Sequence, residues 1–114
     1  MQETLQQFDN LIGGAWVPPA SGETIEVMNP ATGETAARVA RSDRADVDRA
    51  VQAADRSFAS WAGTSAKERA RLMHGAADRV REHLEEISRL LTIEMGKPLQ
   101  DSRKEVQHSA EVLD

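Results

Sequence analysis

The side chains of this sequence that could do chemistry are three histidines and a large set of carboxylates, and there is no cysteine. His74, His83 and His108 are not three or four residues apart, as two metal ligands on one helix face would be. His74 and Asp78 could share a face, but two ligands do not make a zinc site. We therefore expect ordinary histidines on helix surfaces and no metal site.

The carboxylates do not suggest an acid–base pair. Four of them fall at exposed or terminal positions of the expected helices: Glu82, Glu85, Glu86 and Glu94. A catalytic pair needs burial or a close neighbour to separate the two pKa values, and a serine nucleophile would need a Gly-x-Ser-x-Gly elbow, which does not occur. Glu94 is unusual because a helix C-terminus disfavours negative charge. Its carboxylate either has a specific partner or is simply exposed to solvent.

The glycines and basic residues do not match phosphate or nucleic-acid sites. Gly13 and Gly14 lack the Gly-x-Gly-x-x-Gly spacing of a dinucleotide loop, and Pro98 follows Lys97 where a P-loop has Ser or Thr. Acidic residues interrupt the basic stretch 67–81, which has no Phe, Tyr or Trp to stack a base. Since the net charge is −5, we expect neither nucleic acid nor an anionic membrane as a partner.

The elements that would position these residues begin with short strands over residues 1–40. Gly13 and Gly14 can both adopt positive φ, which favours a two-residue hairpin within 11–17. Alternating apolar residues and turn signals predict a second hairpin over 24–40. Isolated hairpins are marginally stable in water, so other structure should cover them.

The first of the helices predicted over residues 42–114 covers 43–61. Either Ser42 or Asp43 is its N-cap, and acidic residues follow in the first turn. Apolar side chains recur at helical spacing: Val47, Ala50, Val51, Ala54, Phe58 and Trp61.

A longer helical stretch runs from a Ser-x-x-Glu capping box at Ser65 to a C-terminal Gly96. Its apolar stripe is interrupted near His83. Gly75 lies within the helix at a cost of about 1 kcal/mol relative to alanine, which suggests close approach by another backbone. An ion-pair ladder is predicted on the exposed face: Arg81, Glu85 and Arg89.

Pro98 suits the first position of a last helix, in which Val106, Ala110 and Leu113 share one face. No Gly, Asn or Pro closes this pattern before Asp114, and no basic residue lies in the last turn. We expect a chain that is cut within a helix, and a frayed terminal helix is the alternative.

The bulk properties bound the class of protein. With 114 residues, the chain forms at most one small domain of marginal stability. An apolar content of 39% argues against disorder. No apolar run is long enough to span a bilayer and no signal peptide is evident, so with no cysteine we expect a cytoplasmic protein.

Six stretches, in this order, resemble the N-terminal region of the NAD(P)-dependent aldehyde dehydrogenases. They are IGGAWV at 12–17, NPATGE at 29–34, DVDRAV at 46–51, Phe58 with Trp61, KERA at 67–70 and EMGKPL at 94–99. The resemblance extends from about Leu11 to Leu113. EMGKPL followed by SAEVLD at 109–114 is most similar to the succinate-semialdehyde dehydrogenase branch.

This resemblance implies an α/β fold in which hairpins (1–40) and helices (42–114) form an incomplete, N-terminal part of the NAD(P)-binding domain. The Rossmann-like sheet that they pack against would come from later sequence. In the family a cysteine thiolate adds to the aldehyde, backbone and asparagine donors hold the oxyanion, hydride passes to NAD or NADP, and a glutamate-activated water releases the acid. The residues that do this lie later than the matched segment, so no catalytic, cofactor-binding or metal residue is assigned here.

The leading hypothesis is the N-terminal part of such an enzyme, acting on succinate semialdehyde and inactive by itself. The full-length enzyme would bind an aldehyde and NAD or NADP and would form a homo-oligomer in the cytoplasm. One alternative is a non-catalytic remnant that binds an intact homologue through its apolar helix faces. A free-standing helical domain of unrelated function is a third.

Overall fold

The computed structural model describes residues 5–114. The chain divides into two compact units. The first, called here the hairpin unit, consists of the described residues up to 28 together with 33–63. The second, the helical unit, consists of residues 29–32 and 64–114.

A tight hairpin opens the hairpin unit. Strands β2 (Asn10–Ile12) and β3 (Ala15–Val17) pair antiparallel, with Ile12 opposite Ala15. The two residues between them have φ values of 61° at Gly13 and 81° at Gly14. Positive φ at both central positions suits the right-handed twist of the strands and is open to glycine at little cost. The predicted two-residue hairpin is confirmed.

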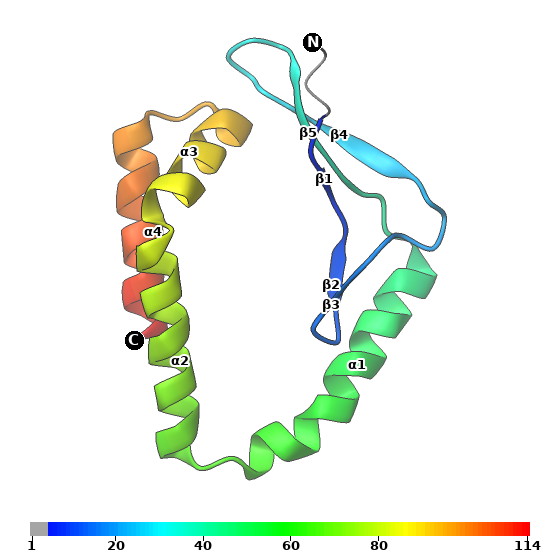
Figure 1. The fold of residues 1–114 in the computed structure, drawn as a ribbon, viewed down its shortest axis with the longest axis vertical. Coiled ribbons are helices and arrows are strands. Elements are labelled where there is room, and N and C mark those ends of the chain that lie inside the picture. The colour runs from blue at the N-terminus through cyan, green and yellow to red at the C-terminus, as the bar shows by residue number, and fades with distance from the viewer. Residues whose placement is uncertain (1–4) are drawn as a thin grey trace. The chain divides into compact units, whose positions relative to one another are not determined.

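A three-stranded sheet lies in the same unit. Strands β4 (Thr24–Met28) and β5 (Thr35–Ala40) form the second predicted hairpin, with an irregularity between Val27 and Met28. Strand β1 (Gln7–Phe8) adds to β5 in parallel, so that the order is β1-β5-β4 (Figure 1). The parallel strand was not predicted, because two residues carry no periodic signal.

Helix α1 (Arg44–Gly63) starts at a reciprocal cap. The Asp43 carboxylate accepts a hydrogen bond from the Asp46 amide at 3.1 Å, and the Asp46 carboxylate accepts one from the Asp43 amide at 3.0 Å. Both groups satisfy amides that the first turn of a helix leaves unpaired. Of the two predicted N-caps, Asp43 is therefore the correct one, and the Ser42 hydroxyl instead donates to Asn10 Oδ1 at 2.9 Å.

The helical unit contains α2 (Ala66–Glu82), α3 (Leu84–Met95) and α4 (Leu99–Leu113). The Ser65 hydroxyl accepts a hydrogen bond from the Glu68 amide at 3.2 Å, as a capping serine should. His83 separates α2 from α3 where the break was predicted. Gly96, with φ 74°, ends α3 and donates its amide to Thr92 O at 2.8 Å. Pro98 is extended at ψ 140° and is the N-cap of α4, not its first helical residue as predicted.

Helix α4 packs against both α2 and α3 (Figure 1). The buried residues at this seam are nearly all small: Ala77, Ser88, Ser102 and Ala110 are 0% exposed, and Val106 is 5% exposed. The hydroxyls of Thr92 and Ser102 lie 2.8 Å apart across α3 and α4. Small side chains let helices approach closely, so the predicted stripe on the last helix does form a core.

Two further predictions for the helical unit are wrong. Within residues 5–114, apart from the adjacent turns of α2 itself, no atom lies within 4 Å of a Cβ built on Gly75, so no other backbone approaches it there. The link from Arg81 to Glu85 in the predicted ladder does not form, because the break at His83 interrupts the helix between them. Glu85 instead accepts two hydrogen bonds from Arg103 of α4, at 2.7 and 2.8 Å.

The predicted α/β class is confirmed by four helices and two small sheets in residues 5–114. These sheets have three and two strands, so the described part of the chain holds no closed Rossmann sheet. None of the helices in this range is long and apolar enough to cross a bilayer.

Candidate functional site

The three histidines lie on helix surfaces or between helices, each beside one carboxylate. His74 Nδ1 lies 3.0 Å from a carboxylate oxygen of Asp114, and His83 Nδ1 lies 3.0 Å from one of Glu86. His108 Nδ1 lies 3.4 Å from a carboxylate oxygen of Glu111. Asp78, the residue expected to share a face with His74, pairs with Arg81 instead. Across residues 5–114, no three His, Asp or Glu side chains come together in a group that could hold a metal ion.

Of the four carboxylates that we considered as acid–base groups, Glu82 and Glu85 are paired with arginines, and Glu86 lies beside His83. The hydrogen bond from Arg79 holds the pKa of Glu82 below its usual range, and the hydrogen bond from Arg103 does the same for Glu85. A general acid near neutral pH needs a raised carboxyl pKa, so these shifts have the opposite sign. Glu94 is exposed at the end of α3, which favours the simpler alternative for that residue.

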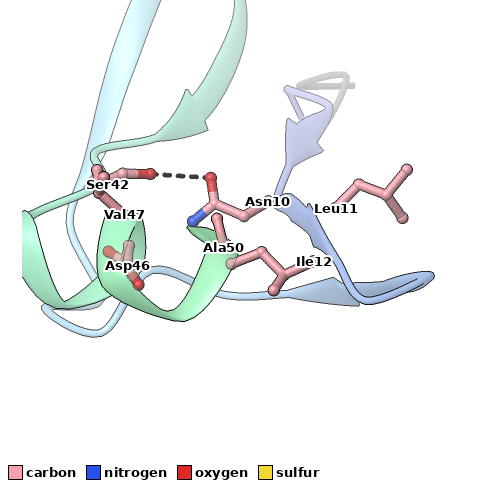
Figure 2. Close-up of a pocket in the computed structure, with 7 residues that line it drawn as sticks. All are labelled: Asn10, Leu11, Ile12, Ser42, Asp46, Val47 and Ala50. Atoms are coloured by element: carbon pink, nitrogen blue, oxygen red, sulfur yellow. Dashed lines mark hydrogen bonds between the residues drawn. The ribbon is translucent and has the colours of Figure 1, made fainter. Parts of the chain in front are cut away.

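A cavity of about 170 Å³ lies between the first hairpin and the start of α1 (Figure 2). Its walls come from β2, from α1 and from the residue before the N-cap: Asn10, Leu11, Ile12, Ser42, Asp46, Val47 and Ala50. This volume is below the range of typical small-molecule sites. The Asn10 side chain reaches toward Ser42, and its Nδ2 atom is buried without a hydrogen-bond partner (Figure 2).

Asp46 is the buried carboxylate of the hairpin unit, with only 2% of its surface exposed. It accepts hydrogen bonds from the Ala20 amide at 3.0 and 3.3 Å, from the Asp43 amide at 3.0 Å and from the Arg49 guanidinium. The hydrogen bond from the Asp43 amide is the main cause of a lowered pKa at Asp46, and burial acts in the opposite direction. Arg49 and the Ala20 amide lower this pKa further. A carboxylate held ionised by this many donors serves the fold and is a poor general base.

Sequence reasoning placed acidic residues in the first turn of this helix but did not single out Asp46. The signal that could have found it is the spacing of Asp43 and Asp46, which is that of a capping box with aspartate in place of glutamate. No pattern in the sequence indicates the hydrogen bond from the Ala20 amide to Asp46, because the two residues are 26 apart in the chain.

Helix α1 leaves its apolar stripe in solvent. Val51 is 61% exposed and Phe58 is 68% exposed, and Val47 and Trp61 on the same face are also exposed. Contiguous exposed apolar surface of this kind is typical of a binding face. The sequence predicted this apolar stripe, and the structure leaves it exposed.

These features define a class of protein segment: a small α/β scaffold with an exposed apolar helix face and, within residues 5–114, no cluster of His, Asp and Glu that could hold a metal ion. A model of the aldehyde dehydrogenase family matches residues 16–114, and the chain belongs to that family.

Individual relatives agree with the family assignment. The chain is 45% identical over 97 residues to acetaldehyde dehydrogenase 2 of Cupriavidus necator, covering 85% of this chain and 19% of that protein. It is 43% identical over 105 residues to malonate-semialdehyde dehydrogenase 1 of Geobacillus kaustophilus, covering 92% of this chain and 22% of the relative. The structure of an NAD-dependent aldehyde dehydrogenase from Sinorhizobium meliloti matches with a TM-score of 0.92 at 32% identity, covering 96% of this chain and 22% of that one.

The chain therefore spans about a fifth of the length of the relatives that it matches. The predicted family is confirmed. The succinate-semialdehyde branch is not, because these relatives carry the names of other aldehydes.

Proposed function

We propose that this chain is the N-terminal part of an NAD(P)-dependent aldehyde dehydrogenase that oxidises an aldehyde to the carboxylic acid. The observation that carries the proposal is the family match over residues 16–114, within a chain that covers only a fifth of its relatives. The role of this part is structural: its apolar helix faces brace the cofactor-binding domain. Cytoplasmic location and homo-oligomeric assembly of the full-length enzyme belong to the same proposal.

The residues described here do not fit the nicotinamide cofactor. Gly13 and Gly14 lie in a hairpin turn, and Gly96 ends a helix, whereas a dinucleotide site needs a glycine-rich turn that opens one. The sequence also has no cysteine to supply the thiolate. Catalysis and cofactor binding are therefore assigned to the rest of the enzyme, and no residue of this chain takes a catalytic role.

Within the family, succinate semialdehyde is the proposed substrate. The support is the similarity of EMGKPL at 94–99 and SAEVLD at 109–114 to that branch. One relative is named for malonate semialdehyde, another short aldehyde that bears a carboxylate, and one for acetaldehyde, which bears none. Turnover of the full-length enzyme with succinate semialdehyde, malonate semialdehyde and acetaldehyde, each with NAD and with NADP, tests the choice. A preference for malonate semialdehyde or for acetaldehyde contradicts it.

The isolated chain is expected to show no NAD(P)-dependent aldehyde oxidation, because it lacks the nucleophile. Formation of the reduced cofactor, followed by absorbance with the same aldehydes, measures this. A full-length family member assayed in parallel is the positive control. Turnover that co-purifies with this polypeptide when no full-length enzyme is present would contradict the proposal.

The exposed face of α1 supports a second candidate function, a non-catalytic protein that binds an intact homologue. This candidate predicts that the chain co-elutes with an intact dehydrogenase in size-exclusion chromatography. Changing Phe58→Glu on the apolar stripe should abolish co-elution, whereas Arg56→Glu, on the opposite side of the helix, should not. Absence of any complex with the unchanged chain counts against this function.

A further inference from the structure

The turn that follows β3 is joined to α1 by hydrogen bonds to the Asp46 side chain. In this turn the Gly22 amide donates to Pro19 O at 2.9 Å, and Pro19 is buried. The Ala20 amide points out of the turn to both carboxylate oxygens of Asp46, at 3.0 and 3.3 Å. Asp46 thereby connects two segments that are 26 residues apart in the sequence.

The same carboxylate also completes the helix cap. It accepts the Asp43 amide, while the Asp43 carboxylate accepts the Asp46 amide. Arg49, one turn further along α1, supplies the counter-charge. A buried ionised carboxylate is tolerated only when donors replace its water, and here two backbone amides and one guanidinium do so.

We propose that the ionised carboxylate of Asp46 is a charge-dependent tether that holds the 19–22 turn against the N-terminus of α1, and that protonation of Asp46 releases the turn. The Asp43 carboxylate accepts the Asp46 amide in a separate hydrogen bond, so the contact that holds the turn is the one from the Ala20 amide to Asp46. The tether is a conformational element of the hairpin unit, independent of the proposed function.

The charged groups around Asp46 set the direction of the pH dependence. Arg49 lies on the same helix and Asp43 at its N-cap, and the turn contributes the Ala20 amide. The three β2 residues that line the shared cavity are all uncharged. The pKa of Asp46 is held below its ordinary value of 3.8, chiefly by the Asp43 amide. The tether is therefore fully formed above pH 3.8 and is lost as the pH falls through the lower, folded value.

The test is an NMR titration of the isotopically labelled full chain, followed at the Ala20 amide and at the Asp46 carboxyl carbon. We expect the two resonances to move together with one midpoint below 3.8. An Ala20 amide that does not move, or that follows the midpoint of another carboxylate, overturns the proposal. A chain in which the Ala20 amide has no exchange protection at neutral pH overturns it as well.

Two matched variants separate charge from packing. Asp46→Asn keeps the shape of the side chain but removes the charge, and should lower the exchange protection of the Ala20 amide by about tenfold or more. Asp48→Asn, an exposed position on the same helix, should leave it unchanged. Equal protection in Asp46→Asn and the original chain overturns the proposal, and if that variant does not fold, the titration of the unchanged chain decides.

Discussion

Replacing Gly96 by alanine is expected to destabilise the helical unit by about 3 kcal/mol. Gly96 has φ 74°, a left-handed conformation that costs an L-residue about 1–2 kcal/mol. The new Cβ would also lie 2.9 Å from Cγ of Pro30, a ring atom that cannot rotate away. Urea denaturation followed by circular dichroism measures the loss as a lower midpoint.

Gly75→Ala is the matched control for this prediction. Gly75 lies in the interior of α2 with open space around it, so alanine should stabilise the helix by about 1 kcal/mol. The two substitutions add the same methyl group and should change the midpoint in opposite directions. A loss of stability in both variants would mean that the surroundings of the two glycines do not decide the effect.

Replacing Ala110 by leucine is expected to cost about 2 kcal/mol or more, because it overpacks the seam between α4 and its two neighbours. Ala110 is 0% exposed, and Ala77 of α2 is equally buried, which leaves no room for three more carbon atoms. The closely packed helices would have to separate or shift. The free energy of unfolding in urea measures the cost.

Val112→Leu, two residues further along the same helix, is the control for overpacking. Val112 is 72% exposed, so leucine there should change stability by less than about 0.5 kcal/mol. If Ala110→Leu were as mild as Val112→Leu, the seam would not be the close-packed core of the helical unit.

Local chemistry made much of the fold predictable from the sequence. Two adjacent glycines at 13 and 14 require a tight turn, Ser65 caps the helix that follows it, and Gly96 ends a helix because it can adopt positive φ. Each of these signals acts over a few residues, so the local sequence is enough to predict the turn or the helix end. The family resemblance, also present in the sequence, indicated the α/β class and the absence of the nucleophile from this chain.

Only the tertiary structure decided the contacts between distant segments. The sequence could not show that Glu85 would bond to Arg103, that β1 would pair with β5, or that Asp46 would be buried against the Ala20 amide. A pattern of apolar residues identifies the face of a helix to be buried, but which side chain meets it depends on how the chain folds back over tens of residues. For the same reason Asp46 appeared in the sequence as one of several helix-start acids, and became a buried tether only when the 19–22 turn was in place.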